Sequence, residues 1–90
     1  MRIPLLGEEN RMESYMILFF THSGAIKFQR NLKKLGVSCT LMPVPRSLSS
    51  NCGIGAKVLY DGDMLALTDN EVEKVYKIQD EDYKEIFHQT

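Results

Sequence analysis

The feature that most limits what this chain can fold into is a continuous apolar run at residues 15–20, YMILFF, flanked by polar residues. A run of this length without a polar side is typical of a strand that is buried on both faces. Such a strand lies in the middle of a sheet. Because the chain has only 90 residues, we expect one compact domain made of two packed layers.

The best-defined helix follows this run. Ser23 is the expected N-cap, because its hydroxyl can accept a hydrogen bond from an unpaired N–H of the first turn. Apolar residues then recur at helical spacing, at Ala25, Phe28 and Leu32. Gly36 is expected to follow the helix, since glycine readily adopts the left-handed conformation that often ends one.

Three further strands and a short helical piece complete the predicted pattern. The strands are expected over residues 37–42, 54–60 and 71–78, and the helical piece within residues 63–70. This order predicts an α+β fold of the ferredoxin-like, split β-α-β type, with a four-stranded antiparallel sheet. The expected strand order is 4-1-3-2, because it buries the apolar first strand centrally.

The remaining segments are expected to flank a single α+β domain over residues 15–78. Residues 1–14 are predicted to be an N-terminal arm, and residues 79–90 an acidic C-terminal tail with one or two helical turns. The sheet face away from the helix would be unusually apolar, so we expect the tail or a second copy of the chain to cover it.

Composition narrows the classes of partner. The net charge is −1, with eight Lys/Arg and three Asp/Glu up to residue 57 and three and nine of them afterwards. A nucleic-acid-binding domain would be basic overall, so no nucleic acid is expected. No stretch has the length of a membrane span or a signal peptide, which predicts a cytoplasmic protein without a membrane partner. The two cysteines form neither a disulfide framework nor a zinc pattern, and we expect no metal and no cofactor.

Residues 43–55, PVPRSLSSNCGIG, form the loop in which we expect the functional chemistry. This segment is too rich in Pro, Ser, Asn and Gly to be a helix or an interior strand. In the predicted fold the loop shares one sheet edge with the N-terminus of the helix. Cys52 would therefore face residues 21–24 and the positive end of the helix, and it would be a thiolate near neutral pH.

A thiolate in this position can attack a disulfide, accept a sulfur atom as a persulfide, or react with selenium species. Cys52 is thus the candidate reactive residue. The residues expected to bind its charge, or an anion, are Arg46, Ser49, Ser50, Gly53, His22 and Ser23. The other interpretation is that Cys52 is a small residue packed at the start of a strand. Cys39 is expected to be a packed structural thiol, and a Cys39–Cys52 pair would need a close approach of the two residues.

The loop resembles that of a small bacterial family described as selenium/sulfur carrier-like proteins. The resemblance rests above all on the pattern Pro-x-Pro-Arg…Ser-Ser-x-Cys-Gly in residues 43–53, and it extends over residues 15–78. It implies that Cys52 is the carrier thiol, and that sulfur or selenium donor and acceptor proteins are the partners. Members of that family usually have a longer segment between the third and fourth strands than residues 61–70 here.

We therefore expect a carrier rather than an enzyme, since no base and orienting residue accompany the thiol at a recognisable spacing. The alternative is a non-catalytic module that binds a small anion or a protein, with Cys52 in a structural role. The sequence is also compatible with a homodimer.

Overall fold

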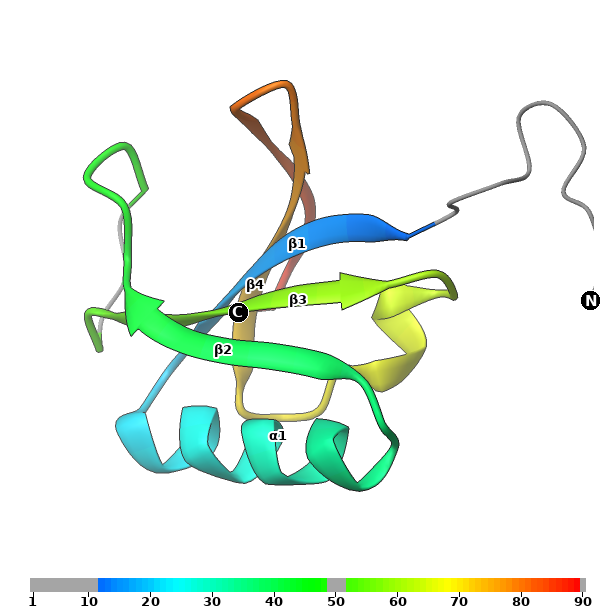
Figure 1. The fold of residues 1–90 in the computed structure, drawn as a ribbon. Helices are drawn as coiled ribbons and strands as arrows, with labels where there is room; N and C mark the ends of the chain where they lie inside the picture. Colours follow the sequence, from blue (N-terminus) through cyan, green and yellow to red (C-terminus); the bar gives the residue numbers. More distant parts are fainter. Residues whose placement is uncertain (1–11, 49–51, 90) are drawn as a thin grey trace, which may run out of the picture.

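A computed structural model describes residues 12–48 and 52–89 of the protein (Figure 1). The elements in this part of the chain are β1 (Glu13–Phe19), α1 (His22–Lys34), β2 (Ser38–Pro43), β3 (Ile54–Tyr60), the 3-10 helix η1 (Met64–Leu67), β4 (Val72–Gln79) and β5 (Asp82–His88). The expected α+β class is confirmed. The short helical piece within residues 63–70 is confirmed as η1.

The strands form one antiparallel sheet in the order β2-β3-β1-β4-β5. The first four strands therefore have the predicted order, with β1 at the centre. The prediction of four strands is wrong, because β5 extends the sheet beyond β4. The ferredoxin-like type stays a prediction.

Strand β5 lies in the segment that was expected to be a helical tail, and that part of the expectation is also wrong. Asp80 and Glu81 form a two-residue turn, both with positive φ (48° and 71°), between the paired residues Gln79 and Asp82. Positive φ at both central residues suits the right-handed twist of a hairpin. The acidic segment has no clear helical or strand periodicity in its sequence. It becomes a strand because it pairs with the edge of β4.

One face of the sheet packs against α1, which lies below β2 and β3 in Figure 1. Ala25, Phe28 and Leu32 of the helix are buried, as their spacing predicted. The rings of Phe28 and Phe19 of β1 lie 5.2 Å apart. The other members of this helix-side core are Tyr15, Ile17, Ala56, Val58, Met64, Val72 and Val75.

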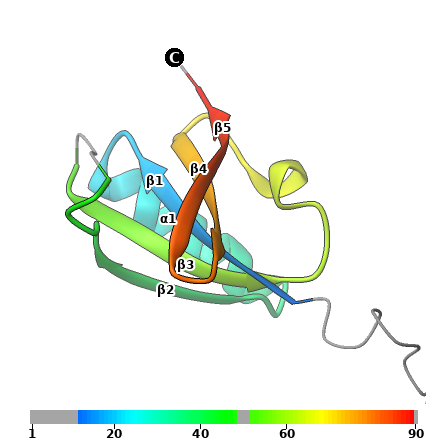
Figure 2. The same ribbon diagram turned by 90° about the horizontal axis from the view of Figure 1, so that it is seen from above.

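The opposite sheet face carries a second, smaller core. Met16 and Leu18 of β1 are buried there beside Tyr76 of β4. The side chains that pack against these three are Met42, Val44, Leu48, Ile78 and Tyr83. The cover thus comes in part from β5 and from the segment after β2. In the view from above, β5 passes in front of the sheet (Figure 2). The expectation that the C-terminal segment covers this face is confirmed for Tyr83.

The prediction from the sequence is correct for the C-terminal end of α1 and wrong for its N-cap. Gly36 has a φ of 76° directly after the C-cap Leu35, as predicted. The N-cap is Thr21 instead of Ser23, and its hydroxyl accepts a hydrogen bond from the N–H of Gly24 at 3.0 Å. Both Thr and Ser suit an N-cap, because each has a side-chain hydroxyl. The position of the junction with β1 makes Thr21, the earlier of the two residues, the N-cap.

Candidate functional site

Cys52 lies two residues before β3, half-buried against the helix-side core. Its thiol donates a hydrogen bond to the carbonyl oxygen of Ile54 at 3.3 Å. Its own carbonyl oxygen lies 2.7 Å from Nε2 of His22. Because a carbonyl oxygen only accepts hydrogen bonds, His22 donates through Nε2–H. The first residue of α1 therefore holds the backbone of the Cys52 loop.

A groove of about 430 Å³ opens beside Cys52 at this end of β2 and β3. The residues that line it are His22, Leu41, Met42, Pro43, Cys52, Gly53 and Ile54. Apart from His22, the described side chains that line it are apolar or carry a thiol, and none of them is a Lys or Arg. The groove therefore favours a weakly hydrated ligand over a highly charged one.

The N-terminus of α1 is contacted by a carboxylate of the chain itself. Oε1 of Glu71, just before β4, lies 3.5 Å from the Thr21 hydroxyl. It also lies 2.8 Å from the position that a Cβ on Gly24 would take. A carboxylate near a helix N-terminus is favourable. Cys52 meets this helix end through its carbonyl oxygen and His22, while its thiol donates a hydrogen bond to Ile54.

Arg46 lies in an exposed turn, in which the N–H of Leu48 donates to the carbonyl oxygen of Pro45 at 3.0 Å. It does not line the Cys52 groove. It also forms no hydrogen bond or ion pair with another residue in the described part of the chain. Its neighbours Ser47 and Leu48 border a different hollow of about 270 Å³, shared with the β4–β5 turn.

Of the other residues expected at the site, some line the groove and others do not. Gly53 lines the groove with a φ of 74°, a conformation that favours glycine. Ser23 is exposed in the first turn of α1 and does not line the groove. Ser49 and Ser50 lie outside the described residues. The structure thus brings His22 and Gly53 to Cys52, whereas Arg46 does not line the groove that these residues share.

Cys39 is a different kind of thiol. It lies half-buried within β2, and this burial raises the pKa of its side chain from 9.0 to about 11. In the sheet it pairs with Val58, four residues along β3 from Ile54. Four strand residues span about 13 Å, whereas Cα atoms joined by a disulfide are at most about 7 Å apart. Cys39 and Cys52 of one chain therefore cannot pair in this fold, and the structure contains no bond between them.

Sequence reasoning missed part of the groove. Leu41 and Met42 belong to the predicted strand over residues 37–42, and no local signal showed that they border a cavity. Pro43 and Ile54 lie within the predicted loop, residues 43–55, but the sequence gives them no role in the site. Glu71 was not recognised as the partner of the helix N-terminus. All of these roles depend on which strands pair and in which register.

Within residues 12–48 and 52–89, no helix combines the length and the hydrophobicity needed to span a membrane. In the same part of the chain, no three His, Cys, Asp or Glu side chains gather closely enough to hold a metal ion.

The fold and the site together define a small α+β protein in which a half-buried thiol borders an apolar groove. A family model described as putative Se/S carrier protein-like matches residues 14–83. The chain belongs to this family, in agreement with the resemblance of its loop. Comparisons with curated proteins and with solved structures give no match.

Proposed function

We propose that this protein is a non-enzymatic carrier that holds a sulfur or selenium atom on the thiol of Cys52. The position of that thiol carries the proposal: it borders a groove at the start of β3, on a loop held by His22. Cys39 is the weaker candidate, because its raised pKa, about 11, leaves almost no thiolate at neutral pH. Family membership supports a carrier role in general.

The loading step is an exchange between two sulfur atoms. The Cys52 thiolate attacks the outer sulfur of a persulfide on a donor protein, and a new S–S bond forms on Cys52. The S–S bond of the donor breaks, and the donor leaves as a thiolate that takes up a proton. No external oxidant or reductant is needed. An acceptor protein then takes the atom by the same kind of exchange.

Two features of the site suit this step. The apolar lining offers a poorly hydrated setting for a soft, weakly hydrated sulfur or selenium atom. The thiol must leave its hydrogen bond to Ile54 when it ionises, because a thiolate has no proton to donate. The loop must therefore rearrange locally during loading, while His22 keeps its backbone in place.

We assign to the loop the role of binding the negative charge of the loaded atom. In this proposal Arg46 holds the anion, with Ser49, Ser50 and the N–H of Gly53 as further donors. Arg46 is exposed and unpaired among the described residues, so its long side chain has freedom to move. The proposal includes a cytoplasmic location, protein donors and acceptors, and a ferredoxin-like fold with β5 added.

The alternative is a binding module in which Cys52 is structural. The hydrogen bond from its thiol to Ile54 and its packing against the helix-side core favour this interpretation. The segment that carries Arg46 also lies beside the acidic β4–β5 turn, where the arginine could serve only to pin the loop. The two functions differ in the chemistry of Cys52, which can be measured directly.

Intact-mass analysis after incubation with a low-molecular-weight persulfide tests the carrier role. We expect the wild type and the Cys39→Ala variant to gain the mass of one sulfur atom, reversibly by a thiol reductant. Cys52→Ala should gain none. Loading of Cys52→Ala to the level of the wild type, or no loading of any variant, would contradict the proposal and favour the binding module.

Alkylation kinetics test the role of Arg46. In Arg46→Ala, Cys52 should react several-fold more slowly at neutral pH, because the thiolate loses the positive charge that this proposal assigns to it. Arg46→Lys should be intermediate, since it keeps the charge and loses the planar fork. Lys57→Ala is the matched control, because it removes an exposed positive charge from β3. An unchanged rate in Arg46→Ala together with a lower stability would assign Arg46 to pinning the loop.

A further inference from the structure

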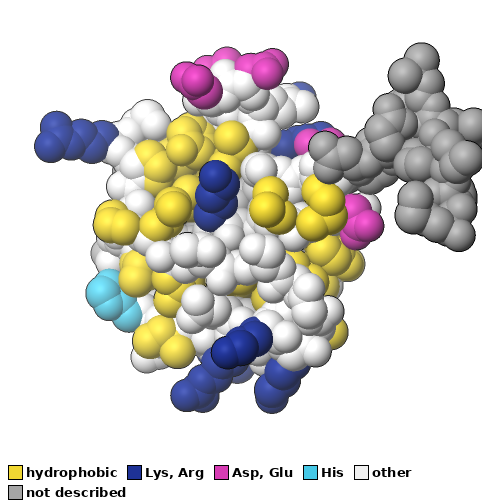
Figure 3. Space-filling view, viewed as in Figure 1, with side chains coloured by type: hydrophobic (Ala, Val, Ile, Leu, Met, Phe, Trp, Pro, Cys, Tyr) yellow, Lys and Arg dark blue, Asp and Glu magenta, His cyan; other side chains and the backbone are white. Residues whose placement is uncertain are grey.

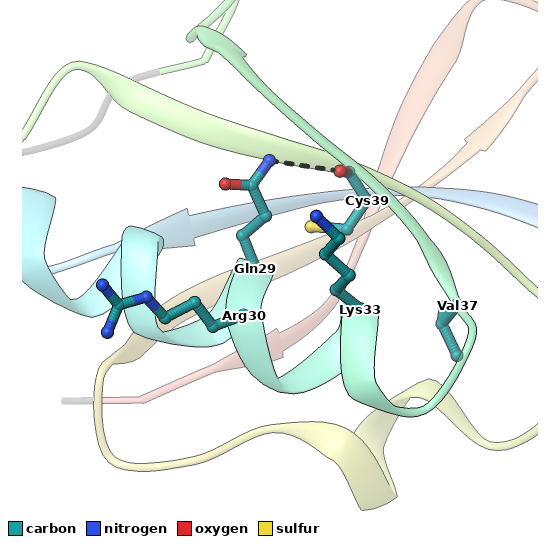
Figure 4. Close-up of a pocket in the computed structure, with 5 residues that line it drawn as sticks. All are labelled: Gln29, Arg30, Lys33, Val37 and Cys39. Atoms are coloured by element: carbon teal, nitrogen blue, oxygen red, sulfur yellow. Dashed lines mark hydrogen bonds between the residues drawn. The ribbon is translucent and has the colours of Figure 1, made fainter.

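A second hollow, of about 440 Å³, lies between α1 and β2 (Figure 4). The residues that line it are Gln29, Arg30, Lys33, Val37 and Cys39. Three come from the helix and two from the sheet side. Its volume falls in the range typical of small-molecule sites, about 300–1,000 Å³. The carrier proposal gives it no role.

The polar side chains of this hollow are hydrogen-bond donors. Arg30 and Lys33 are cations, and the amide of Gln29 donates to the carbonyl oxygen of Cys39 at 3.4 Å. None of the described residues that line the hollow is an Asp or Glu, and α1 contains neither. Among the described residues, neither cation has an ion-pair partner. Figure 3 shows Lys and Arg at the bottom of the molecule, where α1 lies, with further Lys and Arg at the centre and upper left, while Asp and Glu lie at the top and on the right.

The geometry separates a charged rim from an apolar floor. In Figure 4 the side chain of Lys33 extends from the helix toward β2, whereas the guanidinium of Arg30 points away from the other labelled residues. Arg30 is exposed and can swing toward a ligand by rotation of its side chain. Val37 and Cys39 are half-buried below the rim. With its raised pKa, Cys39 stays a neutral thiol at pH 7, so the hollow keeps a net positive charge.

We propose that this hollow binds a small organic anion. Its phosphate or carboxylate group contacts Lys33 and Arg30, and a short apolar part packs on Val37 and Cys39. The inference does not rest on the carrier function. Cys39 pairs with Val58, four residues along β3 from the start of that strand, so the hollow and the Cys52 groove lie toward opposite ends of β2. Failure of one proposal therefore leaves the other standing.

An NMR titration of the full chain with phenyl phosphate, at constant ionic strength, tests the site. We expect saturable shifts of the backbone and side-chain amides of Gln29, and of the amides of residues 30–39. Lys33→Ala should weaken binding about tenfold, as expected for the loss of one charge-assisted hydrogen bond. Lys27→Ala is the matched control, because it removes the same charge from α1 outside the hollow. It should change the affinity less than twofold.

Two comparisons complete the design. Inorganic phosphate should bind at the same residues more weakly than phenyl phosphate, because it lacks the apolar part. Phenol should produce no saturable shifts, because it lacks the charge. Equal losses in Lys33→Ala and Lys27→Ala would overturn the proposal in favour of unspecific attraction by the helix. Shifts that do not saturate, or that lie outside residues 29–39, would overturn it as well.

Discussion

At the scale of single residues, the two thiols lie in different surroundings. Cys39 lies within a strand, where burial disfavours the charged form and raises its pKa to about 11. Cys52 lies on a loop, where its thiol meets a backbone carbonyl beside an open groove. Both are half-buried.

The raised pKa of Cys39 makes stability depend on pH. Between pH 9 and about 11 the unfolded chain loses the thiol proton and the folded chain keeps it. The free energy of unfolding should therefore fall as the pH rises through this window, and this contribution is fully present below pH 9. In Cys39→Ala the fall should be shallower than in the wild type, as measured by urea unfolding at several pH values. The control Thr40→Ala, at the exposed neighbouring position, should keep the wild-type slope. Equal slopes in all three proteins would refute the assigned pKa.

At the scale of elements, the first turn of α1 is closely packed against the start of β4. Gly24 is buried there, and an alanine would bring its Cβ to 2.7 Å from the Cβ of Glu71. Real Cβ atoms do not approach so closely, so one element must shift. The glycine is therefore required by the contact between helix and strand.

Gly24→Ala should lower the free energy of unfolding by about 1–3 kcal/mol, the usual cost of overpacking. At an exposed position inside a helix, the same change would stabilise by about 1 kcal/mol. Ser23→Ala is the control, because Ser23 is exposed in the same turn, and its effect should stay within about 0.5 kcal/mol. Chemical denaturation measures both. A stabilised Gly24→Ala protein would show that the contact is looser than described.

The β4–β5 turn offers the opposite case, in which glycine should help. Glu81 has a φ of 71°, where a side chain costs about 1–2 kcal/mol. Glu81→Gly should therefore raise the free energy of unfolding by about 1 kcal/mol, after the entropic cost of glycine in the unfolded chain. Lys84→Gly is the control, because it places glycine within strand β5 and should destabilise. Loss of stability in Glu81→Gly would speak against the left-handed turn.

At the scale of the whole molecule, the sheet has two apolar faces that need cover. Helix α1 covers one, and the other is covered by side chains from β5 and from the segment after β2. The rings of Tyr83 in β5 and Tyr76 in β4 lie 6.3 Å apart, edge to face. Strand β5 therefore belongs to the folded unit, although its charge pattern marks it as a tail.

A chain that ends at Gln79 tests this conclusion. It lacks β5, which uncovers the second core and leaves β4 as an unprotected edge. We expect it to bind a hydrophobic dye and to associate, as seen by dye fluorescence and light scattering. A chain that ends at Gln89 keeps every residue of β5 and should stay like the wild type. A shortened chain with the wild-type unfolding midpoint and no dye binding would restore the tail interpretation.

Local patterns determined the main elements of the fold. The apolar run of β1 required cover on both faces, and the spacing of Ala25, Phe28 and Leu32 defined the buried side of α1. Gly36 marked the helix end through a conformation that glycine adopts without strain. Composition also identified the Cys52 loop, and the matched family includes that loop. These features depend on residues that are close in the chain.

The tertiary structure alone decided the partners of these elements. The acidic segment became β5 because an open edge of β4 was available for hydrogen bonding. Thr21 became the N-cap where Glu71 meets the helix, 50 residues away in the chain. The groove at Cys52 exists because β2 and β3 pair in the register Pro43 with Ile54. The physical reason is common to all three: pairing and packing join distant segments, and no local period records which segments meet.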